Sequence, residues 1–151
     1  MNYTLIRDCD VANGEGIRIS LFVSGCPHKC KGCFNQEAWD FNCGQEFTQE
    51  TEDKIIKMLK PCYIKGFSLL GGEPMAPSNR ERLLPFLKRL KDIYPNKDIW
   101  CWSGYELEEL KDLEILNYID VIIAGKFVLE QRDTTLKFMG SRNQELIRLL
   151  H

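Results

Sequence analysis

Three cysteines fall within eight residues of this chain, at Cys26, Cys30 and Cys33. Thiolates are soft ligands, and three of them this close together can hold a metal ion or an iron–sulfur cluster. The set is incomplete, because tetrahedral structural zinc takes four ligands and an ordinary iron–sulfur cubane takes four cysteines. Either a fourth ligand comes from elsewhere in the chain, or one position is left for a ligand that is not protein.

Structural zinc is one alternative, with His28 inside the loop or Cys43 beyond it as the fourth ligand. Structural zinc sites usually take two pairs of ligands from separate arms, and no second pair is visible in the sequence. The cysteines at 9, 62 and 101 are isolated, as is typical of packing residues. A cubane with one open position fits three clustered thiolates better, and zinc remains the alternative.

Length and composition limit the other possibilities. A chain of 151 residues predicts a single domain, 1–151, and its 44% of hydrophobic residues are enough for a core. The net charge of -2 gives no basic surface for nucleic acid, and no apolar run approaches the roughly 20 residues that span a membrane. The N-terminus lacks the layout of a signal peptide, and seven cysteines without an export signal favour metal or redox chemistry over disulfides. We therefore expect a cytoplasmic protein.

The elements that must position the cysteines follow an alternating order. Apolar, β-rich runs predict strands at 17–23, 66–70, 98–102 and 119–123. Helical spacing predicts helices at 48–60 and 78–93, the second beginning with a capping box at 78–81 and burying Leu83, Leu87 and Leu90. Leucines at 107, 110 and 113 predict short helices, and the segment 143–150 fits either a helix or an edge strand. Alternating strands and helices predict an α/β fold with a mainly parallel sheet.

Four turns that contain glycine each follow directly on an expected strand, at residues 24–25, 71–72, 103–104 and 124–125. The carboxyl ends of parallel strands meet at one edge of the sheet, where α/β proteins bind their ligands. The cysteine loop follows the first of these strands, and Trp39, Phe41 and Cys43 are expected to fold back over it. We therefore predict that this edge is the active face.

The Cys-x3-Cys-x2-Cys spacing after one strand, with Gly-Gly-Glu-Pro at 71–74 after the next, resembles the radical S-adenosylmethionine (SAM) superfamily. The resemblance implies a small, incomplete (β/α) barrel. It also implies that Cys26, Cys30 and Cys33 bind three irons of a [4Fe–4S] cluster, while SAM chelates the fourth iron through its amino and carboxylate groups. The missing ligand of the cysteine set would then be SAM.

The same resemblance implies the residues that contact SAM. The Gly-Gly-Glu segment would lie along the methionine part of SAM, and the residue after the third cysteine would stack near the adenine. The implied cofactor-binding residues are Gly32, Cys33, Phe34, Gly71, Gly72 and Glu73. Glu73 has a second reading, as a helix-side carboxylate or a salt bridge at the end of the sheet.

Further motifs sharpen the resemblance. The segments 13–18 (NGEGIR), 30–35 (CKGCFN), 102–105 (WSGY) and 140–144 (GSRNQ) occur in the order found in the activating proteins of anaerobic ribonucleotide reductases, which they resemble. That family implies reductive cleavage of SAM and removal of a hydrogen atom from a glycine of the reductase large subunit, which leaves a glycyl radical. The cofactors do this chemistry, so no catalytic acid or base is expected.

Three expectations remain open. Lys29 and Lys31 beside the cysteines are either a solvated loop or, with His28, a docking patch for an acidic electron donor such as flavodoxin. Trp100 and Trp102 share one face of a strand and are expected in the core. The target is either the anaerobic reductase or another glycyl radical protein or small molecule, and a zinc module is the alternative of a different class.

Overall fold

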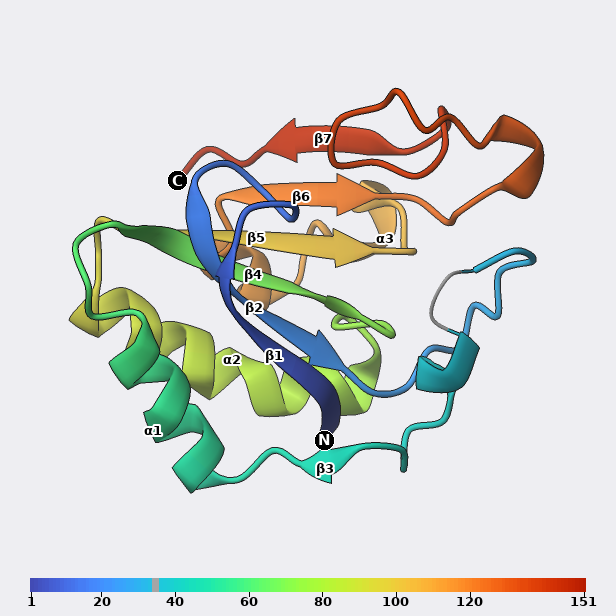
Figure 1. Cartoon of the computed structure of the whole chain (residues 1–151). Coiled ribbons are helices and arrows are strands. Elements are labelled where there is room, and N and C mark those ends of the chain that lie inside the picture. The colour runs from blue at the N-terminus through green and yellow to red at the C-terminus, as the bar shows by residue number, and fades with distance from the viewer. Residues whose placement is uncertain (34–35) are drawn as a thin grey trace.

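The computed structural model describes residues 1–33 and 36–151. A seven-stranded sheet runs through the molecule, and helices cover one of its faces (Figure 1). The strands lie in the order β3-β1-β2-β4-β5-β6-β7. Their bounds are Asn2–Asp10 (β1), Ile17–Val23 (β2), Gln45–Glu46 (β3), Ile64–Gly71 (β4), Asp98–Ser103 (β5), Val121–Ala124 (β6) and Glu145–Arg148 (β7).

The four central strands are the ones that the sequence predicts, and they are parallel. β2 pairs with β4, β4 with β5, and β5 with β6, all in parallel register. β1, β3 and β7 are antiparallel additions at the two sides of this run. The segment 143–150 therefore contributes an edge strand rather than a helix. The mainly parallel α/β sheet is confirmed in its centre, and the described strands form an open sheet whose edges are β3 and β7.

The first strand has no counterpart in the sequence prediction. β1 runs antiparallel to β2, but the register shifts between Tyr3 and Leu5 and again between Arg7 and Asp10. Cys9 lies in the second shift with a φ of 51°, a conformation that side-chain-bearing residues rarely adopt. Two irregularities within nine residues blur the alternation of apolar and polar positions by which a strand is recognised.

Two longer helices and several short ones follow the strands. They are α1 (Gln49–Met58), α2 (Pro77–Ile93), α3 (Leu107–Leu110) and the 3-10 turns η1 (Gln36–Trp39), η2 (Glu114–Tyr118) and η3 (Leu129–Gln131). The predicted capping box of α2 is wrong: the N-cap is Ala76 and no side chain caps the helix. Pro77 occupies the first turn, where a missing N–H costs nothing. Asn79 is buried, and its side-chain amide donates to the carbonyls of Ser24 and Glu73.

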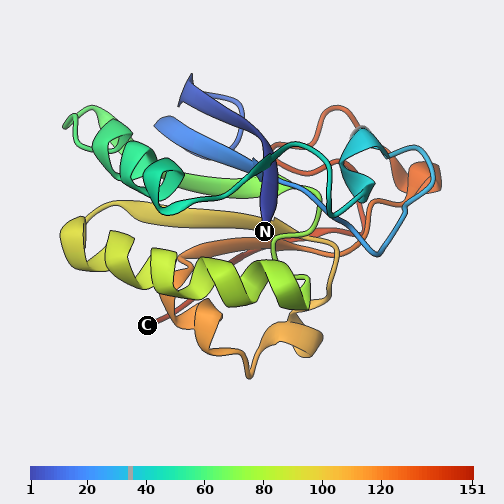
Figure 2. The same cartoon turned by 90° about the horizontal axis from the view of Figure 1, so that it is seen from below.

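The core lies between the sheet and helices α1 and α2, which lie side by side on one face (Figures 1 and 2). Leu83, Leu87 and Leu90 of α2 are fully buried there, as predicted. The opposite face of the sheet carries a second, smaller cluster of Trp100, Val121 and Ile123. In the described part of the chain, no helix is long and apolar enough to cross a membrane.

Candidate functional site

The cysteine loop begins where β2 ends and is tied to the chain that follows it. The N–H of Gly25 donates to the carbonyl of Ala38 at 2.7 Å, and the N–H of Cys26 donates to the carbonyl of Trp39 at 3.1 Å. The hydroxyl of Ser24 donates to the carbonyl of Cys43 at 2.8 Å. The segment around residues 38–43 therefore folds back over the loop, as the sequence predicts.

The end of β4 touches the cysteine loop through its backbone. The N–H of Gly72 donates to Val23 at 2.8 Å, and the N–H of Glu73 donates to Gly25 at 2.7 Å. A Cβ atom on Gly72 would lie only 2.4 Å from the carbonyl oxygen of Gly25, so no larger residue fits without displacing the loop. The two motifs of the sequence are thus joined directly at the carboxyl edge of neighbouring strands.

One cavity opens at this edge and brings most of the predicted site together. Its lining includes Cys26, Cys30, Cys33, Gly71, Gly72 and Glu73 from the two motifs, and Trp102, Gly104, Gly125, Phe127 and Gln144 from the ends of β5 and β6 and beyond. A second cavity shares Cys33, Gly71 and Gly72 with the first and extends to Asn13 and Phe138. The four predicted glycine turns therefore do converge on one edge of the sheet.

Among the described residues, Gly32 is the one predicted cofactor-binding residue that lines neither cavity. Gly32 has a φ of 78°, and a Cβ atom there would lie 2.8 Å from a methyl group of Leu129. Its backbone conformation and its neighbour therefore account for the glycine without a cofactor. Phe34 lies outside the described residues.

The side-chain carboxylate of Glu73 makes hydrogen bonds to other residues of the protein with both of its oxygens. Its side chain is almost fully buried, and its Oε1 accepts from the N–H of Gly104 at 2.6 Å and lies 2.7 Å from Nε2 of His28. Its Oε2 accepts from the hydroxyl of Ser103 at 2.8 Å and from the N–H of Met75 at 2.9 Å. The carboxylate of Glu73 therefore joins strand ends, while Glu73 also lines the cavity beside Gly71 and Gly72, and its contact with SAM stays a prediction.

His28 is not part of a solvated loop. Only 6% of its side chain is exposed, and its ring packs edge-on against Tyr105, with 4.6 Å between the ring centroids. Its Nε2 already faces the carboxylate of Glu73, so zinc ligation through that nitrogen would break the pair. Lys29 and Lys31 on either side of Cys30 are exposed.

Burial raises the pKa of the thiols of Cys26 and Cys30. It raises the pKa of Cys26, partly opposed by backbone N–H groups of His28 and Lys29 that hydrogen-bond to the sulfur. Burial likewise raises the pKa of Cys30, opposed by the N–H of Phe127 and the charge of Lys126. Metal binding to such thiols must release protons, because the thiolate is the ligand.

The donor set fits a cluster. Among residues 1–33 and 36–151, no three His, Cys, Asp or Glu side chains stand close enough to hold one metal ion. The three cysteines nevertheless line one cavity, and a cubane takes each thiolate on a different iron. The N–H groups that interact with the thiol of Cys26 are the kind of contact that stabilises cluster thiolates.

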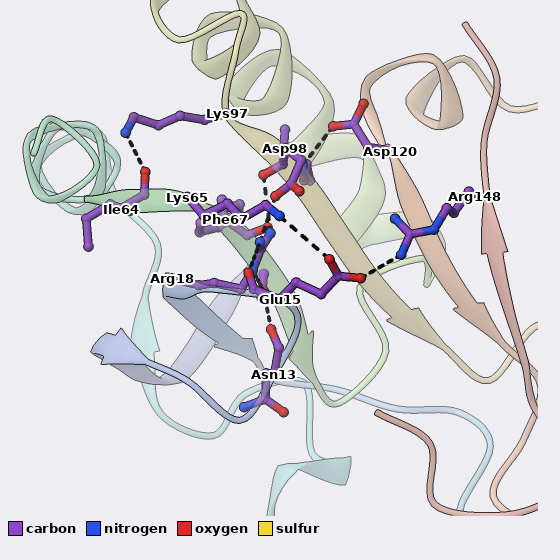
Figure 3. Close-up of polar contacts among 12 residues, drawn as sticks. Asn13, Glu15, Arg18, Ile64, Lys65, Phe67, Lys97, Asp98, Asp120 and Arg148 are labelled. Atoms are coloured by element: carbon purple, nitrogen blue, oxygen red, sulfur yellow. Dashed lines mark hydrogen bonds and ion pairs between the residues drawn. The ribbon is translucent and has the colours of Figure 1, made fainter. Parts of the chain in front are cut away.

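A buried arginine holds the NGEGIR segment against the sheet (Figure 3). Arg18 is fully buried, donates from Nε to the hydroxyl of Ser68 at 2.7 Å and pairs with Asp98 at 2.7 Å. The same hydroxyl of Ser68 donates to the carbonyl of Asn13 at 2.6 Å. At the surface, Glu15 of this segment pairs with Arg148 of β7 at 2.6 Å.

The position of Asn13 in the second cavity depends on a buried carboxylate. Asp10 is 3% exposed and accepts from the side chains of Ser20 at 2.6 Å and Asn13 at 2.7 Å, and from the N–H of Ala12 at 2.9 Å. Burial alone would raise the pKa of Asp10, but these donors together hold that pKa below its ordinary value. The sequence assigns no role to Asn13, although it lies within one of the motifs.

Gln144 is a second residue without a predicted role. Its Oε1 accepts from the N–H groups of Gly140 and Ser141 at 2.8 and 3.1 Å, and its Nε2 donates to the carbonyl of Gly125 at 3.0 Å. These hydrogen bonds of Gln144 hold the segment between β6 and β7 in place, and residues of that segment line both cavities. The GSRNQ motif was the signal in the sequence, but spacing alone gave it no function.

Comparison with known proteins agrees with this geometry. The model of the 4Fe-4S single cluster domain family matches residues 12–147. An anaerobic ribonucleoside-triphosphate reductase-activating protein from Vibrio cholerae is 51% identical over 152 residues, with 98% of each chain covered. Proteins of the same name from Haemophilus influenzae and Escherichia coli K12 are 51% and 44% identical, each with 95% of this chain and 96% of the relative covered. The chain thus belongs to the family of anaerobic ribonucleoside-triphosphate reductase-activating proteins.

Proposed function

We propose that this chain, as one radical SAM domain over residues 1–151, generates a glycyl radical on the large subunit of an anaerobic ribonucleotide reductase. The observation that carries the proposal is the single cavity lined by Cys26, Cys30, Cys33, Gly71 and Gly72. It lies at the carboxyl edge of the parallel strands, in a chain whose relatives are named as activators of that reductase. The open sheet would be a partial form of the radical SAM barrel.

Cys26, Cys30 and Cys33 would hold the [4Fe–4S] cluster, and SAM would complete it. When bound, the cluster and SAM would supply one-electron reductive cleavage of the sulfonium, with the electron coming from the reduced cluster, for removal of the glycine hydrogen atom. Gly71 and Gly72 line the cavity, so the methionine part of SAM would lie along the backbone where β4 ends. Because the carboxylate of Glu73 is already engaged, this segment would contact SAM through its main chain.

The other residues that line the cavities would bind and orient the ligand and would exclude water. Trp102 is half-buried and fixed by a 2.8 Å hydrogen bond from its indole nitrogen to the carbonyl of Phe138. With Phe127 and Gln144 it lines both cavities, so a ligand that spans them would lie against a rigid, largely apolar wall. Such a wall protects a reactive radical from side reactions.

The electron donor and the compartment are part of the same proposal. Lys29 and Lys31 are exposed on the cysteine loop and give a positive surface close to the proposed cluster. An acidic carrier such as flavodoxin would dock there, because opposite charges steer association. A cytoplasmic location would keep the three cysteines reduced before the cluster is assembled.

The test is anaerobic reconstitution followed by incubation with SAM and dithionite. We expect iron and sulfide to bind, 5′-deoxyadenosine to form, and the reductase large subunit to acquire a glycyl radical signal in electron paramagnetic resonance. Cys30→Ala should abolish all three, whereas Cys62→Ala, at an exposed cysteine far from the cavity, should leave them unchanged. Iron bound through three intact cysteines without 5′-deoxyadenosine would refute the proposal, and a colourless zinc protein would replace it with a structural site.

A further inference from the structure

We propose that His28 and Glu73 are positioning residues that lock the cysteine loop to the ends of β4 and β5 and thereby set the environment of Cys26. The pair joins a residue inside the ligand loop to a residue of the glycine motif, 45 positions apart in the chain. The inference rests on the proposed function, because the loop it locks is the one that would hold the cluster. It assigns Glu73 to the protein rather than to SAM.

The hydrogen bonds of Glu73 leave no place for a ligand. A carboxylate has about four lone-pair sites, and four neighbours already occupy those of Glu73. Two of them are the main-chain N–H groups of Met75 and Gly104, which cannot turn away without moving the backbone. An ammonium group from SAM could reach this carboxylate only if one of these bonds broke.

The ring of His28 is held by specific contacts, as the carboxylate of Glu73 is. Because the carboxylate only accepts, Nε2 of His28 must be the donor across the 2.7 Å contact. A Cβ atom on Gly104 would lie 2.5 Å from Cδ2 of this ring, so the glycine that follows β5 makes room for the imidazole. The same Gly104 donates its N–H to Glu73, so β5 supports both members of the pair.

The His28–Glu73 pair affects the proposed cluster through the main chain of the cysteine loop. Backbone N–H groups of His28 and Lys29 interact with the thiol of Cys26 and lower its pKa. Lys29 holds a φ of 50°, a left-handed conformation that a non-glycine residue adopts only when its surroundings impose it. Fixing the ring of His28 keeps these two N–H groups in place, and hydrogen bonds to sulfur are among the factors that set the reduction potential of an iron–sulfur cluster.

Four variants of the full chain test the pair. His28→Leu removes the donor and keeps bulk, His28→Gln keeps a donor near the position of Nε2, Glu73→Gln removes the carboxylate, and His28→Leu/Glu73→Gln removes both. His151→Gln and Glu130→Gln are matched controls, because His151 contacts the carbonyl of Ile119 far from the cavity and Glu130 is exposed. Far-ultraviolet circular dichroism checks that each variant folds.

The first measurement uses the apo-protein, so that it does not depend on the cluster. Trypsin cleaves after Lys29 and Lys31, within the loop that the pair holds. We expect His28→Leu and Glu73→Gln to be cut on the order of tenfold faster than the wild type, with His28→Gln and both controls unchanged. Equal cleavage rates in all of them would overturn the inference. If Glu73→Gln does not fold, the comparison of His28→Leu with His28→Gln decides alone.

The second measurement separates the lock from a SAM ligand. In the reconstituted proteins we expect His28→Leu and Glu73→Gln to shift the reduction potential in the same direction and to lower iron retention by roughly 10–100-fold, the range for residues that support ligands. The double variant should be no worse than either single one. If only Glu73→Gln weakens SAM binding, with potential and iron retention unchanged, Glu73 is a SAM ligand and the inference is wrong.

The two proposals fail in different ways. A wild-type protein that cleaves no SAM while its variants still lose protection from trypsin refutes the proposed function and leaves the lock standing. A wild-type protein that cleaves SAM while the variants keep their protection, potential and iron refutes the lock alone.

Discussion

Replacing Arg18 by methionine is the most direct test of how the site is supported. Arg18 is fully buried and pairs with Asp98 at 2.7 Å. Methionine fills a similar volume, so the variant removes the charge and its hydrogen bonds without leaving a large cavity. The perturbation therefore reports on the polar network alone.

The expected cost follows from burial. Removing one partner of a buried ion pair costs about 3–5 kcal/mol, because the other charge is left uncompensated. The side chain of Asp98 is 28% exposed, so water recovers part of its solvation and the low end, about 3 kcal/mol, is expected here. For a chain of this length each 1 kcal/mol lowers Tm by roughly 2–4 °C, so Tm should fall by roughly 6–12 °C.

Arg148 provides the matched control. It belongs to the same network and pairs with Glu15 at 2.6 Å, but 62% of its side chain is exposed. Surface ion pairs contribute about 0–1 kcal/mol, so Arg148→Met should cost no more than that. Urea unfolding of the apo-proteins, followed by circular dichroism, gives both free energies. A loss at Arg18 no greater than the loss at Arg148 would refute the reasoning from burial.

Three further predictions follow from the site. The pKa of Asp10 is lower in the folded protein than in the unfolded chain, so Asp10 stabilises the fold above the unfolded pKa of about 3.9 and this contribution is lost as the pH falls through the folded pKa. In urea unfolding at a series of pH values, Asp10→Asn should therefore lose less unfolding free energy on acidification than the wild type. Parallel curves of unfolding free energy against pH would contradict this. Gly72→Ala should reduce iron retention on reconstitution, because its Cβ would lie 2.4 Å from the carbonyl oxygen of Gly25. The Cβ of Gly140→Ala meets side chains only, the ring of Phe127 at 3.1 Å and Oε1 of Gln144 at 3.7 Å, so equal iron contents in the two variants would count against the backbone contact. Reversing Lys29 and Lys31 to glutamate should slow reduction of the cluster by flavodoxin but not by dithionite, and equal rates with both reductants would reject the docking surface.

The sequence predicts the four parallel strands at the centre of the sheet. The apolar runs 17–23 and 98–102 are too hydrophobic for surface strands, and each ends in a glycine turn. The apolar runs predict buried, parallel strands, and the glycine turns predict which edge of the sheet their carboxyl ends share, because a buried parallel strand must be followed by a turn at its carboxyl end. The convergence of the turns on the cavity lining confirms that argument.

Other parts of the fold and the site depend on contacts that spacing does not encode. The irregular β1 gains its place by pairing with β2, despite its shifts in register. The position of His28 depends on Glu73 and on the space above Gly104, which come from two other strand ends. A loop histidine that precedes a lysine is usually solvated, so only the three-dimensional arrangement reveals the pair.

The wall held by Gln144 has a consequence for the order in which the molecule is completed. Residues 126–144 can line the cavities only after β7 has paired with β6, for example through Ala124 and Glu145. The contact between Gly32 and Leu129 spans almost a hundred residues of chain, and closing contacts of such separation is slow. The cysteine loop therefore gains its last wall only when β7 has docked. If this loop holds the cluster as proposed, loading of the cluster is a readout of completed folding.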